Sequence, residues 1–120
     1  MPIVDIEIVG AHSVANDLAT RLADMAGKVF GGPPGTTWVR VRLLPCYLYA
    51  ENDSEEPDGW LSVFVTVLKA QRPTGAALQA EVSALTEGVA SVCDRLPENV
   101  HILYESDLQG RIAIGGHVKG

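Results

Sequence analysis

The second residue, Pro2, offers the clearest chemistry in this sequence. It follows Met1 and opens the run 3–9, in which apolar and acidic residues alternate. If Met1 is removed, the Pro2 nitrogen becomes a secondary amine whose lone pair can accept a proton and return it. Pro2 is therefore a candidate general base, held in place by the strand behind it. A proline is also tolerated at the start of a strand simply because that position need not donate a ladder hydrogen bond.

Two arginines could assist such a base. An ordinary α-amino group has a pKa of about 7.7–8.0, and a nearby cation lowers that value because it disfavours the ammonium form. Arg40 and Arg42 could supply this charge. Their guanidinium groups could also bind a substrate carboxylate through paired hydrogen bonds and stabilise the negative charge of a dienolate. The same two residues would equally suit a solvated strand face.

The composition limits the classes of partner. The 120 residues suggest one domain, 1–120, and fifteen acidic against nine basic side chains give a net charge of −6. This excess of acids argues against binding to nucleic acid. No apolar run is long enough to span a membrane, and no basic segment begins a secretion signal, so we expect a soluble, cytoplasmic protein. Cys46 and Cys93 lack the spacing of metal ligands and are expected to be reduced; no metal or cofactor is predicted.

The first half of the chain predicts a strand, a helix and a second strand. Alternation at 3–9 is the pattern of a half-buried strand. Ser13 can cap a helix whose apolar residues recur every three or four positions as far as Val29. Glycines and prolines at 31–35 end that helix. A strand at 37–44 follows, with Trp38, Arg40 and Arg42 on one face.

The second half predicts the same order of elements. An acidic segment, 51–59, is typical of an exposed loop. The strand that follows Trp60 carries apolar residues on both faces, which indicates a central position. A helical stripe then runs from Leu78 to Leu96, and a fourth strand covers 100–105. The short segment 111–114, before two glycines expected to be flexible, closes the chain.

The two halves match when one is shifted by 60 residues. The shift superposes the helices without a gap and places His12 on Arg72. The chain is thus predicted to contain an internal repeat, approximately 2–58 and 61–120. Each strand-helix-strand unit should hold its two strands parallel, with the helix across one face. The expected fold is two-layer α+β: a four-stranded mixed sheet with both helices on one face, plus short terminal strands. A second subunit should cover the other face, whose apolar residues would otherwise be wet.

These features resemble the tautomerase superfamily, which includes 4-oxalocrotonate tautomerase, 5-carboxymethyl-2-hydroxymuconate isomerase and macrophage migration inhibitory factor. The resemblance covers nearly the whole chain. It rests on the opening Pro2-Ile3-Val4, the strand 38–41, the doubled unit and the closing segment 110–116. It implies that Pro2 is the base or acid and that arginines bind the substrate carboxylate. It also implies a homotrimer with the site where three sheets meet, for which a dimer is the alternative.

The resemblance assigns roles to several residues. Arg40 stands where short members carry an arginine in the second strand, and Arg72 stands where they carry another before the helix. His12 occupies the first-unit copy of that place, and Ser62 is the second-unit counterpart of Pro2, so each chain has one proline site. The candidate substrate-binding residues are Arg40, Arg42, His12, Arg72, Tyr104 and Trp38, with His101 and Arg111 as weaker candidates.

The resulting hypothesis is a tautomerase-type isomerase in which Pro2 acts as general base on small, carboxylate-bearing enols or unsaturated keto acids. A first alternative is related dehalogenase, decarboxylase or hydratase chemistry, in which Pro2 acts as an acid and Glu105 could activate water. A second is a noncatalytic trimeric binding protein. This last alternative applies if Met1 is retained, because the Pro2 nitrogen is then part of an amide and has no lone pair to offer.

Overall fold

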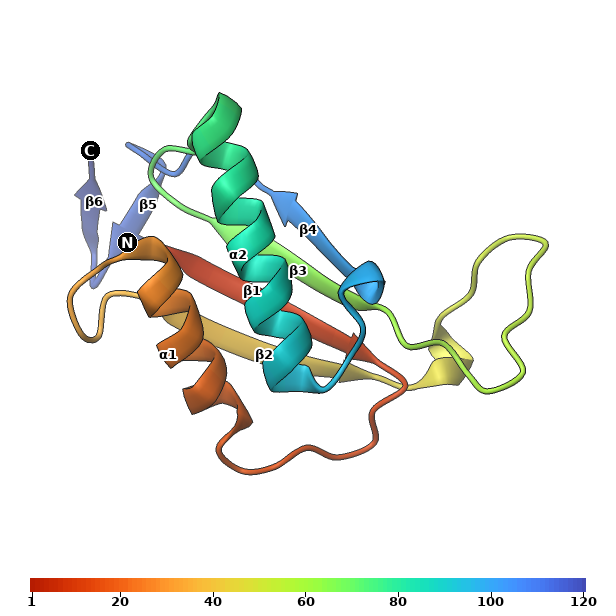
Figure 1. The fold of residues 1–120 in the computed structure, drawn as a ribbon. Coiled ribbons are helices and arrows are strands. Elements are labelled where there is room, and N and C mark those ends of the chain that lie inside the picture. Colours follow the sequence, from red (N-terminus) through yellow and green to blue (C-terminus); the bar gives the residue numbers. More distant parts are fainter.

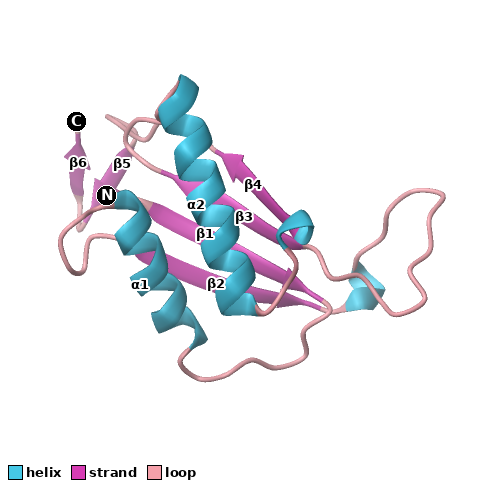
Figure 2. Ribbon diagram, in the orientation of Figure 1, coloured by secondary structure: helices cyan, strands magenta, loops and turns pink.

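Two helices cover one face of a four-stranded sheet (Figure 1). The computed structural model describes the whole chain, from Met1 to Gly120. A separate antiparallel pair of short strands closes the chain, and Figure 2 shows both helices on the same side of the main sheet. The predicted two-layer α+β fold with short terminal strands is confirmed. Its elements are β1 (Ile3–Val9), α1 (Leu18–Phe30), β2 (Trp38–Leu44), β3 (Val63–Leu68), α2 (Gly75–Cys93), β4 (Val100–Tyr104), β5 (Ile112–Ile114) and β6 (His117–Lys119).

The sheet joins the two units through their first strands. The strand order is β2-β1-β3-β4, with β1 parallel to β2 and β3 parallel to β4. Between the units, β1 and β3 are antiparallel, and Ile3 lies opposite Leu68. The parallel pair within each unit is the arrangement that the sequence predicted. Because β1 and β3 run in opposite directions, the start of β1 lies beside the end of β3.

The core lies between the sheet and the helices. Val4, Ile6 and Ile8 of β1 are buried there, as the alternation predicted, and helix residues Leu22 and Leu85 are fully buried against the sheet. Each successive residue of a strand points to the opposite face. The intervening positions of the strands therefore form the other face, which no helix covers.

The uncovered face is partly charged and partly apolar. Its residues include Asp5 and Arg40 on the two first-unit strands and Phe64 on β3. Trp38 and Leu103 remain exposed on this face, by 39% and 63%. The loop 49–59 extends away from the sheet in Figure 1, although the ring of Tyr49 at its start packs against Phe64 on this face.

Two helix ends differ from the sequence prediction. Ser13 does not cap α1, which begins at Leu18, five residues later; Asp17 precedes it and makes no side-chain cap hydrogen bond. The residues before Leu18 form a loop because they have little apolar surface to bury, and Val14 is 41% exposed. The apolar stripe of α2 stops before Leu96, since Asp94 adopts a left-handed conformation that ends the helix.

The end of the chain also differs from expectation. The two glycines predicted to be flexible, Gly115 and Gly116, have φ angles of 58° and 87° and form the turn between β5 and β6. His117, in the tail beyond these glycines, lies in β6. Neither α1 nor α2 has the length and hydropathy that a membrane crossing requires. Cys46 and Cys93 are both free thiols.

The structure predicts opposite outcomes for two leucines of the sequence-derived helical stripe. Leu85→Ala should lower the free energy of unfolding by about 2–5 kcal/mol, because it removes a fully buried side chain from the core. Leu96→Ala should change it by less than about 0.5 kcal/mol, because Leu96 is 62% exposed. Urea unfolding at matched protein concentration measures both values. Equal losses of unfolding free energy in the two variants would contradict the observation that α2 ends before Leu96.

Candidate active site at the start of strand β1

Pro2 lies at a cavity of about 610 Å³. The register of β1 and β3 explains why the end of β3 forms one wall, since Ile3 is opposite Leu68 and the chain then turns away. The backbone N–H of Leu108 donates to the carbonyl of Lys69 over 2.9 Å, which brings in the segment before β5. The terminal strand pair adds the last wall. Its lining includes Pro2, Lys69, Gln71, Gln109, Ile112 and Lys119.

Sequence reasoning found only Pro2 among these residues. Lys69, Gln71, Gln109 and Lys119 were not among the candidates. The signal that could have identified Lys69 is the antiparallel pairing of the first and third strands, which brings the residue after β3 next to Pro2. Gln71 donates to Gln109 over 2.6 Å, so the two loops that border the cavity are joined by a side-chain hydrogen bond.

Lys69 belongs to a network that reaches the helix layer. Its Nζ donates to Oε1 of Glu81, on α2, over 2.8 Å. The same Nζ lies 4.9 Å from the centre of the Phe30 ring, a cation–π contact. Tyr104 donates its hydroxyl hydrogen to the other oxygen of Glu81. Both carboxylate oxygens of Glu81 are thus occupied, one by each partner.

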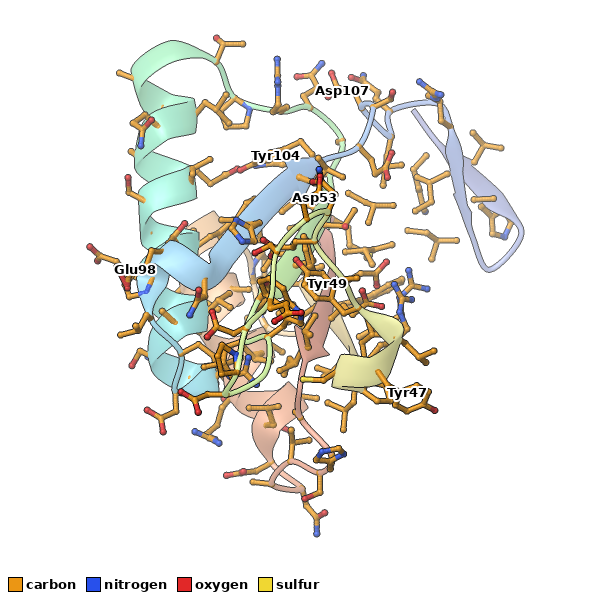
Figure 3. All side chains as sticks on the ribbon, turned by 90° about the vertical axis from the view of Figure 1, so that its right-hand side faces the viewer. Tyr47, Tyr49, Asp53, Glu98, Tyr104 and Asp107 are labelled. Carbon is orange, nitrogen blue, oxygen red and sulfur yellow. The ribbon has the colours of Figure 1, made fainter.

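Tyr104 is held in its protonated form. Burial raises the pKa of Tyr104, and the hydrogen bond to Glu81 and the negative charge of Glu81 raise it further, while Arg72 acts in the opposite direction. Figure 3 shows Tyr104 at the end of the molecule where Asp107 lies. Tyr104, a predicted substrate-binding residue, lies on the helix-covered side of β4, where its hydroxyl group donates a hydrogen bond to Glu81.

Arg40 and Arg42 lie on the uncovered face of the sheet. Arg40 donates to both oxygens of Asp5, over 2.5 and 2.7 Å, and this pairing raises its pKa. Arg42 Nε lies 3.9 Å from a carboxylate oxygen of Glu7. Neither arginine lines the Pro2 cavity of its own chain. The sequence indicated their face correctly but not their acidic partners, which are their cross-strand neighbours in the register of β1 and β2.

Trp38 is the candidate residue that contacts Pro2 through the backbone. Its N–H donates to the Pro2 carbonyl over 3.0 Å, and its indole N–H donates to the carbonyl of Gly35 over 3.0 Å. Trp38 therefore fixes the chain just after the Pro2 nitrogen. Its side chain is outside the cavity wall.

His12 and Arg72 lie at opposite ends of the sheet. The repeat aligns them in sequence, but β1 and β3 are antiparallel, so His12 follows the far end of β1 whereas Arg72 follows the end of β3 near Pro2. Arg72 borders a second cavity of about 550 Å³ beside Glu81, and its backbone N–H donates to Asp107 over 3.0 Å. Within one chain, only Arg72 of this pair is near the Pro2 end.

The weaker candidates are on the uncovered face or at its edge. The His101 ring centre is 5.4 Å from that of Phe64, and Arg111 shares a cavity of about 320 Å³ with Asp5 and Glu105. Neither borders the Pro2 cavity.

The second-unit counterpart of Pro2 has a different chemical environment. Ser62 is buried and lies at the other end of the sheet, at a cavity of about 430 Å³. That cavity is bordered by four carboxylates, whereas the Pro2 cavity is bordered by two lysines. The cavities at the two ends of the sheet therefore differ in the charge of the side chains that border them. The four acids are Glu51, Glu56, Asp58 and Glu98.

Solved structures of known proteins share this fold. A native fused 4-OT matches with a TM-score of 0.77 and 21% sequence identity, over 97% of this chain and 94% of that one. A macrophage migration inhibitory factor homologue from Prochlorococcus marinus matches with a TM-score of 0.73 and 15% identity, over 98% and 99% of the two chains. The chain has the fold of the tautomerase superfamily.

A further tautomerase-fold structure extends the range of chemistry among the neighbours. Malonate semialdehyde decarboxylase matches with a TM-score of 0.66 and 16% identity, over 94% of this chain and 90% of that one. No protein-family model and no curated protein matches the sequence. The likeness is thus one of tautomerase fold, and the residues around Pro2 must carry any argument about activity.

The network predicts how Tyr104 titrates. The ionisation of each tyrosine gives a step in ultraviolet absorbance as the pH is raised, and the step that is missing in Tyr104→Phe belongs to Tyr104. Its midpoint should lie above the usual tyrosine pKa of about 10, because burial and Glu81 favour the neutral phenol. Glu81→Gln should move this step to lower pH. The stability that the raised pKa contributes is present below about pH 10 and is lost as the pH rises through the pKa of folded Tyr104. A step that Glu81→Gln leaves unmoved would contradict this assignment.

Proposed function

We propose that this protein, once Met1 is removed, is a tautomerase-type isomerase in which Pro2 is the general base. Its substrates are small enols or unsaturated keto acids that carry a carboxylate. The observation that carries the proposal is the cavity at Pro2, whose volume of about 610 Å³ is within the usual range for small-molecule sites. Lys69 and Lys119 border it, and so do apolar residues such as Ile112 and Ile114.

The chemistry needs one group that can take a proton and return it. The Pro2 amine would remove a proton from the hydroxyl group of an enol or from a carbon of an unsaturated keto acid, leaving the bonding electrons on the substrate as an enolate or dienolate, and would then deliver the proton to a carbon at another position. The negative charge of the dienolate favours a site with cations, and Lys69 and Lys119 border this one. Ile112, Ile114 and Leu108 would exclude water, which strengthens these electrostatic interactions.

Met1 controls the site in two ways under this proposal. While Met1 is attached, the Pro2 nitrogen is an amide without basic character. Met1 also borders the cavity, so its removal would both create the amine and enlarge the space in front of it. Retention of Met1 would instead favour the noncatalytic binding protein. Mass spectrometry of the native N-terminus distinguishes the two forms.

The proposal includes a homotrimer located in the cytoplasm. Trp38 and Leu103 expose apolar surface on the face that no helix covers, and two fused 4-OT neighbours are described as wild-type trimers. Arg40 and Arg42 lie on this same face, so in an assembly they could reach a carboxylate bound in a neighbouring copy. His12, at the end of the sheet far from Pro2, could also serve only another copy's site.

A second candidate function is favoured by one neighbour. The malonate semialdehyde decarboxylase structure is described as a basis for decarboxylase and hydratase activities. In the corresponding chemistry here, protonated Pro2 would act as an acid, and another group would activate water. Glu105 borders a small cavity with Arg111 and Asp5, away from the Pro2 cavity of its own chain. The isomerase is the better-supported choice because it needs no second catalytic group.

The base itself is tested with Pro2→Ala. Protein confirmed by mass to lack Met1 should ketonise phenylenolpyruvate, and Pro2→Ala should reduce kcat/KM by about 100-fold or more, because it replaces the positioned secondary amine. The matched control is Ala113→Gly, an exposed substitution in β5 whose side chain is outside the cavity wall. Equal rates for Pro2→Ala and the unsubstituted protein would reject Pro2 as the base.

The trimer is tested by mass in solution. Sedimentation equilibrium at low micromolar concentration should give about three times the 12.8 kDa chain mass, because a closed ring buries the uncovered face of every copy. Twice the chain mass would indicate the dimer instead. A stable monomer would reject any site shared between copies.

A further inference from the structure

Lys69 faces Pro2 across the pair of strands that joins the two units. The register places Ile3 opposite Leu68, and one further step places Pro2 opposite Lys69. Directly opposed residues of an antiparallel pair have Cβ atoms about 4.5–5.5 Å apart. Because successive residues alternate between faces, both point to the helix-covered side, unlike Ile3 and Leu68. Both also border the same cavity.

The side chain of Lys69 is fixed, which is unusual for a lysine at a cavity. It is only 20% exposed, and its partner Glu81 is 12% exposed. One oxygen of Glu81 accepts from Lys69 over 2.8 Å, and the other accepts from Tyr104. The Phe30 ring lies against the same ammonium group. Tyr104 thus orients Glu81, and Glu81 together with Phe30 orients Lys69.

Other charges near this end of the sheet are placed differently. Lys119 also borders the cavity, but it lies on the exposed strand β6. Arg72 is exposed and borders the second cavity, which Lys69 and Glu81 share. The charged and titratable side chains that border these two cavities or form hydrogen bonds with their lining residues are Lys69 after β3, Glu81 on α2, Tyr104 on β4, Lys119 on β6, and Arg72 and Asp107 in the adjoining loops.

We propose that Lys69 lowers the proton affinity of the Pro2 amine and donates a hydrogen bond to the enolate oxygen formed when Pro2 removes the substrate proton. Glu81 and Tyr104 are positioning residues that act through Lys69. In this step the Pro2 lone pair forms the new N–H bond, the electrons of the broken bond stay on the substrate as enolate, and the Lys69 N–H contacts the enolate oxygen. The hydrogen bond to substrate rests on the proposed function, whereas the effect on Pro2 does not require turnover.

The electrostatic part is tested on the chain that begins at Pro2, with proline labelled with nitrogen-15 and its amine titrated by NMR. Lys69→Met should raise the Pro2 pKa by about one unit or more, because it removes a nearby positive charge. Glu81→Gln should lower it, because it removes a negative one. The matched control, Lys28→Met, removes a lysine on the exposed last turn of α1 and should leave it unchanged. Shifts of opposite sign would not follow from a general disturbance of the fold.

The catalytic part is tested with an enol acid and its ester. Lys69→Met should lower kcat by about 100-fold on both, since both form the same enolate, and Lys69→Arg should restore part of the rate. Arg40→Ala, in contrast, should raise KM for the acid alone, because it removes a guanidinium group that would bind the substrate carboxylate.

The outcomes separate the two proposals. If Pro2→Ala loses activity but Lys69→Met leaves both the Pro2 pKa and the rate unchanged, the role of Lys69 is rejected and the proposed isomerase stands. If the protein converts no enol at all, the proposed function fails, and the Pro2 pKa values still decide whether Lys69 acts on the amine. Should Lys69→Met fail to fold, Glu81→Gln and Lys69→Arg give the decision: an unshifted Pro2 pKa in Glu81→Gln would reject the proposal.

Discussion

The antiparallel pairing of β1 with β3 is the constraint on which the rest of this structure depends. Each strand-helix-strand unit alone has a two-stranded parallel sheet, which is too small to bury a helix on its own. Joining β1 to β3 produces one sheet wide enough for both helices, with Ile6 opposite Val65 at its centre. The same pairing places the start of the first unit beside the end of the third strand, and so creates the neighbourhood of Pro2.

Much of the fold could be predicted from local patterns, because both units bury one face of each strand and one stripe of each helix. The alternation around Ile6 and the repeat at a shift of 60 residues identified the strands, the helices and the mixed sheet. The start of α1 could not be found in this way. Ser13 has the chemistry of a helix cap, but the residues that follow it have too little apolar surface to bury, so the helix begins where Leu18 can reach the core.

The candidate site was harder to predict than the fold, because its residues are brought together across the sheet. Pro2 was identifiable from its place in the chain, whereas Arg40 and Arg42, identified from the composition of their strand, lie outside the Pro2 cavity of their own chain. Lys69 stands in an unremarkable segment between a strand and a helix, and its significance comes from Pro2, Glu81 and Phe30. Alignment of the two halves paired His12 with Arg72, and each does follow the first strand of its unit, but only the antiparallel pairing of β1 and β3 shows that they lie at opposite ends of the sheet.

The wall formed by the terminal strand pair has a practical consequence for work on this protein. Met1 and Gly120 both border the Pro2 cavity, and Figure 1 shows the two chain ends at the same end of the molecule. A purification tag or fluorescent label fused to either end would therefore emerge at the opening of the cavity. The acidic loop around Asp53 projects from the opposite end of the sheet (Figure 1). An internal label in that loop would lie away from the Pro2 cavity, because no residue of the loop borders it.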